Sequence, residues 1–376
     1  MSHRIHSARR RVPIGRRQLT HEPVKLVLAL AGVALAVALV GLLFGLREGI
    51  NRQVSTFEDN AGADVYVASK GTRDFPTSGS STLPASLARE VGAVPGVAEA
   101  VPVTNSLGIL TLHDKRVATL LVGFEPGRLG GPWDMAEGRR PQRPGEIAVD
   151  SVMAEAHGLD LGDTVQVRGQ PLRVVGLTDG TAAWMTPLIF VTRQTANALE
   201  GIGDSARFVL VSGADRESLA TRIARRFPDL NVMTREELRA NDRELLSRSF
   251  NSPLLVMVLI ALGVGALVIG LTTYGFVADR RREFGSLKAI GERNGRLYRL
   301  VAGQAVAIAT VGLAGGIVLR IAAGSTIHTV SPKFLFVSLP AHYAILVAAA
   351  LAMGLAGALV PVRVLARLDP QEVFRR

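Results

Sequence analysis

Four long runs of apolar residues constrain the fold of this chain more than any other feature of its sequence. They cover residues 26–46, 253–277, 300–319 and 343–360, and none contains an Asp, Glu, Lys, Arg or His. About 20 helical residues cross a bilayer core about 30 Å thick, because each residue adds about 1.5 Å. A soluble core rarely contains four uncharged stretches of this length, so the sequence predicts four transmembrane helices.

The net charge of +11 is concentrated beside these runs. Residues 1–25 carry seven Lys or Arg against one Glu, residues 278–299 seven against three, and residues 361–376 four against two. Basic flanks stay in the cytoplasm, so we expect both termini and residues 278–299 on the cytoplasmic side of a bacterial inner membrane. Residues 47–252 and the short loop 320–342 then lie outside. A nucleic-acid-binding protein would instead carry a basic patch on a folded domain, so nucleic acid is not an expected partner.

The N-terminal part of the chain leaves two questions of interpretation. Residues 26–46 are longer than the apolar region of a typical signal peptide, and no small-residue cleavage site precedes Arg47, so an uncleaved helix is expected. The basic segment 4–22 suits either an interfacial helix held by anionic lipid or a disordered tail.

Residues 47–252 are predicted to form one extracytoplasmic α+β domain, inserted between the first and second spans. Residues 72–82 are rich in Pro, Gly and Ser and are predicted to be a mobile loop, whereas residues 234–252 are predicted to be a charged helix that leads into the second span. The predicted strands cover residues 63–69, 97–103, 107–112, 117–124, 146–149, 164–167, 172–177, 188–192 and 208–212, and the predicted helices cover residues 84–94, 152–157, 194–200 and 216–226.

Several kinds of chemistry have no basis in this sequence. It contains no cysteine, no Gly-Lys dipeptide and therefore no Walker A loop, and no H-E-x-x-H or G-x-S-x-G motif. Its seven histidines show no zinc-ligand spacing. We therefore expect no catalytic site, metal or cofactor in this chain. The absence of ionisable residues from the apolar runs also argues against a transporter driven by an ion gradient.

Three polar residues at the outer membrane border are candidate substrate contacts. Glu48 follows Arg47 just after the first span, although a solvated helix end explains it better than a substrate contact does. His328 and His342 flank the predicted outer loop and could meet a haem or a metal ion. The alternative for both histidines, which we weight more heavily, is an ordinary polar residue at the membrane interface.

The segment 278–299 has the properties of a helix that docks on a cytoplasmic partner. Phe284, Leu287 and Ile290 are predicted to form an apolar face beside the charged residues. Retention of basic residues in the cytoplasm explains the arginines of this segment but not the glycines at positions 285 and 291. The candidate docking residues are Arg280, Arg281, Arg282, Glu283, Phe284, Gly285, Lys288 and Gly291.

Three blocks of the sequence resemble the MacB/FtsX-type permeases of ATP-binding-cassette (ABC) systems. ADRRREFGSLKAIGERNGRLYRL (278–300) is similar to the cytoplasmic segment of that family, and GRRPQRPGEIAVDSVMAEAHGLDLGDTVQVRGQPLRVVGL (138–177) to its extracytoplasmic domain. PVRVLARLDPQEVFR (361–375) resembles its closing tail, in which Asp369 is placed to cap a helix and Pro370 to occupy its first position. The exit from the first span, GLREG (45–49), is similar to the DevC and haem-exporter (HrtB-like) branch.

The resemblance implies a permease subunit that forms a homodimer in the lipid membrane and pairs with a separate cytoplasmic ABC ATPase. That ATPase would bind ATP and Mg²⁺, and the segment 280–291 and the tail at Asp369 and Pro370 would contact it. Two functions then compete. One is mechanical export of a hydrophobic cargo such as haem, lipid, lipopeptide or a drug, which the large inserted domain favours. The other is an FtsX-like transmembrane switch that activates an extracytoplasmic partner; a sensor that relays an external signal inward is a weaker third possibility.

Overall fold

The computed structural model describes residues 23–77, 79, 81–112, 115–183, 186–290, 292–330 and 339–367. By their contacts these residues separate into two units, a helical unit and a unit that contains residues 47–252, called here the inserted domain. The predicted interfacial segment 4–22 and most of the predicted outer loop lie outside the described residues.

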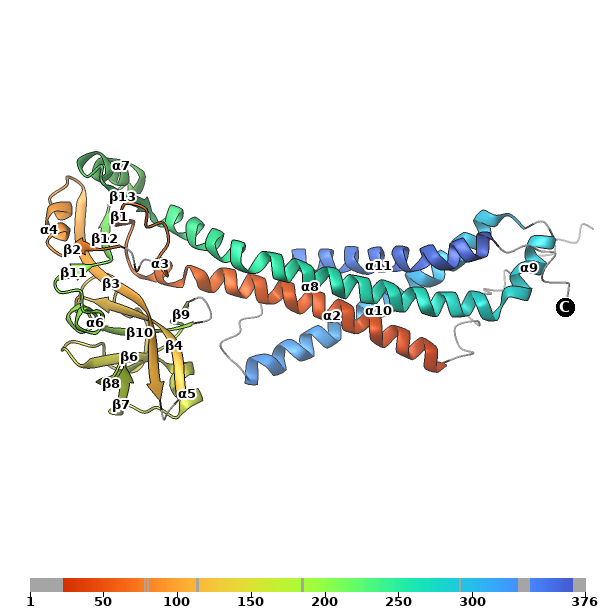
Figure 1. Cartoon of the computed structure of the whole chain (residues 1–376), viewed down its shortest axis with the longest axis horizontal. Helices are drawn as coiled ribbons and strands as arrows, with labels where there is room; N and C mark the ends of the chain where they lie inside the picture. The colour runs from red at the N-terminus through yellow and green to blue at the C-terminus, as the bar shows by residue number, and fades with distance from the viewer. Residues whose placement is uncertain are drawn as a thin grey trace, which may run out of the picture. The chain divides into compact units, whose positions relative to one another are not determined.

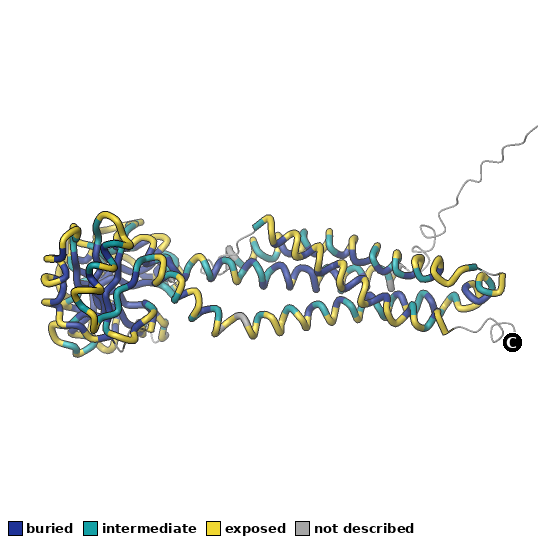
Figure 2. The backbone as a smooth tube through the Cα atoms, turned by 90° about the horizontal axis from the view of Figure 1, so that it is seen from above, coloured by how far each residue is buried: buried dark blue, intermediate teal, exposed yellow. Residues whose placement is uncertain are grey.

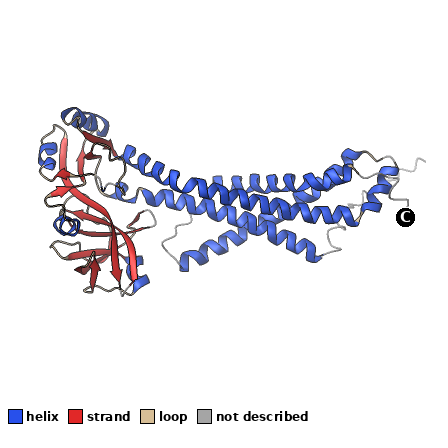
Figure 3. Ribbon diagram, viewed as in Figure 1, coloured by secondary structure: helices blue, strands red, loops and turns tan. Residues whose placement is uncertain are grey.

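Among the described residues, four helices are long and apolar enough to cross a membrane, which agrees with the four predicted spans. They are α2 (Pro23–Val54), α8 (Arg235–Asp279), α10 (Asn294–Val330) and α11 (Pro340–Ala366), and the short helix α9 (Arg281–Ala289) lies between α8 and α10 in the chain (Figures 1 and 3). Helix α8 contains the predicted charged segment and the second apolar run as one continuous helix with Pro253 inside it. The chain thus has the expected fold class, a four-helix membrane unit with an α+β domain between the first and second spans.

The third apolar helix is longer than predicted, and this changes the environment of Arg320. We expected an outer loop to begin at Arg320, but α10 continues to Val330. Arg320 is 4% exposed, its Nε donates a hydrogen bond to the Gly41 carbonyl oxygen at 3.1 Å, and its guanidinium carbon lies 5.6 Å from the centre of the Tyr343 ring. The predicted start of the outer loop at residue 320 is therefore wrong, because Arg320 lies inside α10 and is buried just beyond the uncharged run 300–319. The apolar residues 321–323 that follow Arg320 were the signal that the helix continues.

The helices of the membrane unit approach one another closely at glycines. A Cβ atom on Gly316 of α10 would lie 2.6 Å from Cβ of Val37 and 2.8 Å from the backbone oxygen of Ala34, both in α2. A Cβ atom on Gly357 of α11 would lie 2.8 Å from Cγ2 of Ile269 in α8. In lipid, helices associate through packing at small residues rather than through the hydrophobic effect. These glycines therefore set the distances between the helices.

The inserted domain is built around a mixed β-sheet, and its predicted α+β class is confirmed. The sheet order is β13-β1-β12-β3-β4-β10-β6-β8-β5, with β7 pairing β3 and β8, β9 pairing β10, and β11 and β2 forming a separate pair. The pairs β10–β4 and β6–β8 are parallel, and the other pairs are antiparallel. The strands are β1 (Val65–Ser69), β2 (Leu83–Pro84), β3 (Val97–Leu112), β4 (Lys115–Phe124), β5 (Met135–Gly138), β6 (Glu146–Asp150), β7 (Thr164–Val167), β8 (Gln170–Thr178), β9 (Ala182–Ala183), β10 (Thr186–Thr192), β11 (Ser205–Ala206), β12 (Phe208–Gly213) and β13 (Leu230–Thr234).

Strand β3 unites two strands that the sequence predicted separately. Residues 97–103 pair with β12, and residues 104–112 pair with β4, so one strand of 16 residues joins both halves of the sheet. The polar residues Thr104, Asn105 and Ser106, which suggested a break, are buried in this strand. Thr104 hydrogen-bonds Asn197 at 2.7 Å and Asn105 donates to the Phe75 carbonyl oxygen at 2.5 Å, so polar partners inside the fold replace the water that a loop would offer.

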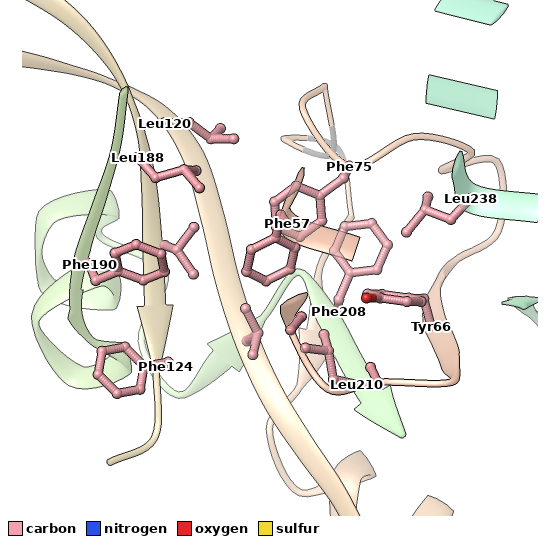
Figure 4. Packing of buried hydrophobic residues seen from close by; sticks show 14 of the residues in the cluster. Phe57, Tyr66, Phe75, Leu120, Phe124, Leu188, Phe190, Phe208, Leu210 and Leu238 are labelled. Carbon is pink, nitrogen blue, oxygen red and sulfur yellow. The ribbon is translucent and has the colours of Figure 1, made fainter. Parts of the chain in front are cut away.

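Five short helices complete the inserted domain: α3 (Thr56–Asn60), α4 (Leu87–Gly92), α5 (Ser151–His157), α6 (Arg193–Glu200) and α7 (Arg216–Arg226). Local sequence explains two of them well, because Asp150 caps the start of α5 and Thr192 that of α6, and each ends at a glycine in the left-handed conformation. In Figure 2 the dark-blue buried segments lie within the inserted domain and also along the long helices. One buried cluster contains most of the aromatic side chains, among them Phe57, Phe75 and Phe208 (Figure 4).

The segment 72–82 was predicted to be a mobile loop, but its described residues are firmly held. Phe75 is 1% exposed and stacks on Phe57 with ring centres 4.2 Å apart. Ser81 is buried and donates to the Arg207 carbonyl oxygen at 2.6 Å, while the Arg207 guanidinium donates back to the Ser81 carbonyl oxygen at 2.6 Å. The composition of the segment correctly indicated irregular backbone, but partners far along the chain immobilise it.

Candidate coupling site on helix α9

Helix α9 follows α8 after one residue, Arg280, and the contacts of Arg280 define the turn between them. The Arg280 carbonyl oxygen accepts the first helical hydrogen bond of α9, from the Phe284 N–H at 3.1 Å. Its guanidinium carbon lies 4.8 Å from the centre of the Phe276 ring in α8, a cation–π geometry, and a guanidinium nitrogen lies 3.8 Å from a carboxylate oxygen of Glu283. Arg280 therefore acts within this chain, at the base of the predicted docking helix.

Phe284 attaches α9 to the ends of three long helices. It is 3% exposed, and it belongs to a buried cluster with Val277 of α8, Leu297 of α10 and Leu365 of α11. The next residue, Gly285, is also buried. Burying an aromatic side chain in this way stabilises a contact by about 1.5–3 kcal/mol relative to exposure. A displacement of α9 is therefore transmitted directly to all three helices.

Lys288 makes a second attachment, between α9 and the last turn of α11. Its Nζ donates hydrogen bonds to the carbonyl oxygens of Leu365, at 2.7 Å, and Ala366, at 3.3 Å. The last carbonyl groups of a helix have no acceptor role inside it, and a lysine there also matches the negative end of the helix dipole. The sequence suggested Lys288 as a contact to a partner protein, whereas in this structure its ammonium group joins two helices of the chain itself.

The opposite side of α9 is open to solvent. Arg281, Arg282 and Glu283 are exposed, and the apolar side chains of Leu287 and Ile290 are 42% and 84% exposed. The three residues predicted to form one apolar face therefore do not share one environment: Phe284 is buried, whereas Leu287 and Ile290 are exposed on the surface. Exposed apolar residues rimmed by arginines are typical of a surface that binds another protein. Gly291, Asp369 and Pro370 lie outside the described residues, and their predicted roles stay predictions.

The structure describes the side chains of two of the three candidate substrate contacts. Glu48 pairs with Arg52 one turn later in α2, at 3.2 Å, which fits a solvated helix surface. His342 is 7% exposed; its Nδ1 accepts a hydrogen bond from the Leu339 N–H at 3.4 Å, at the start of α11, and its ring lies 6.2 Å from that of Phe44. The backbone of His328 belongs to α10, and its side chain lies outside the described residues. Within the described residues no group of three or more His, Cys, Asp or Glu could hold a metal ion.

The inserted domain has a polar pocket of about 510 Å³ beside α4, β3 and the start of α6. A chain of ion pairs runs along it: Arg128 contacts Glu99 at 2.8 Å and Glu125 at 3.0 Å, and Arg193 contacts Glu125 at 3.3 Å and Asp204 at 2.8 Å. Since these charges neutralise one another, the pocket offers no excess charge of either sign to a ligand. It is a rigid polar surface that sequence reasoning did not identify, because its residues come from distant parts of the chain.

Family models match nearly all of the chain. The model of the MacB-like periplasmic core domain matches residues 26–226, and that of the FtsX-like permease C-terminal region matches residues 255–370. The chain belongs to the MacB/FtsX-type permease family. This membership confirms the resemblance inferred from the three sequence blocks.

The permease has similar relatives along its full length. It is 28% identical over 355 residues to an uncharacterized ABC transporter permease of Mycobacterium tuberculosis strain H37Rv, covering 93% of this chain and 95% of the relative. It is 23% identical to the macrolide export ATP-binding/permease protein MacB of Shewanella oneidensis, covering 95% of this chain and 59% of that protein. The periplasmic region of MacB from Actinobacillus actinomycetemcomitans aligns with a TM-score of 0.37 at 17% identity, covering 48% of this chain and 92% of that one.

Proposed function

We propose that this permease is the membrane subunit of an ABC-type export system and that a separate cytoplasmic ATPase docks on the exposed side of α9. The ATPase would bind ATP and Mg²⁺, because this chain has no Walker A loop. The arrangement of α9 is the observation that carries the proposal. One side of α9 is attached to α8, α10 and α11 through Phe284 and Lys288, and the other side presents arginines and exposed apolar residues.

Through this connection, ATP hydrolysis would move the membrane helices, and the helices would pass that movement to the inserted domain. The helices would not form the walls of a pore. The close glycine contacts within one chain support that reading, since they leave the helices tightly packed. The function we favour is export of a hydrophobic cargo, such as haem, a lipid, a lipopeptide or a drug. In this proposal the inserted domain lies outside the membrane and both termini lie in the cytoplasm. A homodimer in lipid would cover the apolar face that α8 leaves exposed at Leu255, Val256, Leu259, Ile260, Val264, Leu267 and Leu271.

The docking proposal is tested by charge reversal on the exposed side of α9. Arg281→Glu with Arg282→Glu should lower co-purification of the ATPase at least about tenfold and remove stimulation of ATP hydrolysis by the permease, since unfavourable charge at an interface costs several kcal/mol. Arg296→Glu is the matched control, because Arg296 is also a cytoplasmic arginine, with its side chain 74% exposed, but lies in α10. If the double variant binds the ATPase and stimulates ATP hydrolysis as the parent chain does, the ATPase does not dock on α9.

The alternative is an FtsX-like switch that activates an extracytoplasmic partner and carries no cargo. An FtsX-like switch would contact the ATPase in the same way as an exporter. The two functions therefore differ in whether a cargo molecule changes the rate of ATP hydrolysis. Haem, lipids and lipopeptides should each be added to the reconstituted complex. Stimulation by one of them supports export, whereas a rate that none of them changes favours the switch.

A further inference from the structure

Two carboxyl groups meet inside the inserted domain. Glu58 lies in α3, and Asp242 lies in the first part of α8. Glu58 is 1% exposed and Asp242 is 0% exposed, and their side chains hydrogen-bond each other. Acidic residues are almost never fully buried without a partner, and here each is the other's partner.

The surroundings of this pair are mostly apolar. Figure 4 shows Phe57, Phe75 and Leu238, whose side chains belong to the buried cluster beside it. Asp242 Oδ1 accepts a hydrogen bond from the Phe75 N–H at 3.0 Å. The other oxygens of interest, Oδ2 of Asp242 and Oε2 of Glu58, are buried and receive no hydrogen bond from any other group in the described part of the chain.

Among the described residues, neither carboxyl of the pair forms an ion pair with a basic side chain. Arg239, whose charge favours ionisation of Glu58, forms an ion pair with Asp59 at 3.0 Å. The remaining titratable and charged groups that face the pair are Asp59, Asp74, Tyr66, Arg239 and Arg235. Of these, the two aspartates disfavour ionisation of the pair, and Tyr66 stays neutral because burial raises its pKa well above the usual value.

Two carboxylates in contact in a buried site cannot both be ionised at low cost, so they share a proton. Burial raises the pKa of Glu58 to about 7, and burial together with the neighbouring Glu58 raises the pKa of Asp242 well above its usual value. The hydrogen bond between the side chains therefore exists only while the proton is present. Ionisation of the second carboxyl would replace that bond by repulsion between two negative charges.

The Glu58–Asp242 pair lies where the inserted domain is joined to the first and second spans along the chain. Helix α3 begins at Thr56, directly after α2 ends at Val54, and α2 contains the first apolar span. Helix α8 continues from Asp242 into the second apolar span. Through the Phe75 N–H the pair also holds the segment 72–82. It is therefore a contact between the two connections of the inserted domain to the membrane helices.

We propose that the proton shared by Glu58 and Asp242 is a latch that holds α8 against α3 and the Phe75 segment, and that loss of this proton as pH rises loosens this end of the inserted domain. The pH of the solution around the inserted domain would then set how rigidly its two connections move together. The sign follows from the order of ionisation. Glu58, with a pKa of about 7, ionises first, and its carboxylate then accepts the proton of Asp242, so the latch stays closed. The latch opens at higher pH, when Asp242, whose pKa is raised by burial and by the neighbouring Glu58, loses that proton.

The experiment uses the full-length chain, which contains no cysteine, in lipid nanodiscs. Spin labels on Asn60→Cys in α3 and Arg243→Cys in α8, both exposed positions, report the distance between the two helices. We expect one distance population at about pH 5.5 and a second, longer or broader population that grows as the pH is raised above about 7, where Glu58 is already ionised and Asp242 loses the shared proton. Glu58→Gln with Asp242→Asn keeps a hydrogen bond without a titrating proton and should give the low-pH distribution at every pH. Glu236→Gln is the matched control, because Glu236 is an exposed carboxylate of α8 that pairs with Arg216, and its loss should leave the response intact.

A second measurement does not depend on the variants folding. Infrared difference spectra of the unsubstituted chain should lose a carboxylic-acid C=O band as pH rises across the same range. The proposal is overturned if that band is unchanged, if the labelled chain gives one distribution at every pH, or if the Gln/Asn variant responds to pH as the parent chain does.

Discussion

Replacing Phe284 by alanine tests whether α9 is attached to the membrane helices as the structure indicates. Phe284 is 3% exposed in a cluster that joins the ends of α8, α10 and α11. Truncation of a buried phenylalanine to alanine costs about 3–5 kcal/mol. Because α9 is short and lies at the edge of its unit, most of this loss should appear as detachment of α9 rather than as global unfolding. Each 1.4 kcal/mol is about a factor of ten, so the attached population of α9 should fall at least about a hundredfold relative to the detached one.

Two assays follow this change. Trypsin should cleave the full-length Phe284→Ala chain faster after Arg281 and Arg282, since a detached segment is open to the protease more of the time. Stimulation of ATP hydrolysis by the permease should fall in parallel, even if the ATPase still binds. Leu287→Ala is the informative comparison, because Leu287 is 42% exposed and is not part of the buried cluster. It should leave the cleavage rate near that of the parent chain and weaken ATPase binding. The reasoning is refuted if Phe284→Ala shows parental rates of both cleavage and stimulated hydrolysis.

Two further predictions concern the two units of the fold. Gly316→Leu should lower the stability of the permease by about 1–3 kcal/mol, since a side chain there would collide with Val37 and Ala34. Gly324→Ala should leave the stability unchanged, because a Cβ at that position would meet nothing within 4 Å. Equal melting temperatures of the two variants would argue against the α2–α10 contact. Residues 47–252, produced alone, should fold into a soluble domain, because three of the buried clusters lie wholly within that range; a product with no cooperative urea transition would contradict this.

The predicted elements of the inserted domain show how far local sequence reaches. The strand at β10 and the helix at α6 were placed within a few residues, because a continuous run of apolar residues and the capping residue Thr192 act over short distances. Strands β5 and β13 were missed, since Met135–Gly138 and Leu230–Thr234 are short and only partly buried. The order of strands in the sheet, in which β1 lies between β12 and β13, depends on pairing partners that are more than a hundred residues apart.

In the candidate coupling site, too, the sequence predicted some residues correctly and not others. The exposed arginines of α9 were recognised from the sequence because their charge and their position beside two spans are properties of a short segment. The role of Lys288 was not, because its acceptors are the carbonyl oxygens of Leu365 and Ala366, 77 and 78 residues away. Nor does any local pattern distinguish Phe284, which is buried, from Ile290, which is not.

By itself the sequence determined that this chain has four apolar helices, an α+β domain between the first two, and basic segments beside the spans. These follow from length, hydrophobicity and charge, which each segment carries independently of its neighbours. Only the tertiary structure decided that Arg320 is buried between helices, that Phe284 and Lys288 attach α9 to the bundle, and that Glu58 meets Asp242. Each of these depends on which distant segment packs opposite a residue, and a burial or a hydrogen bond of that kind is a property of two segments together.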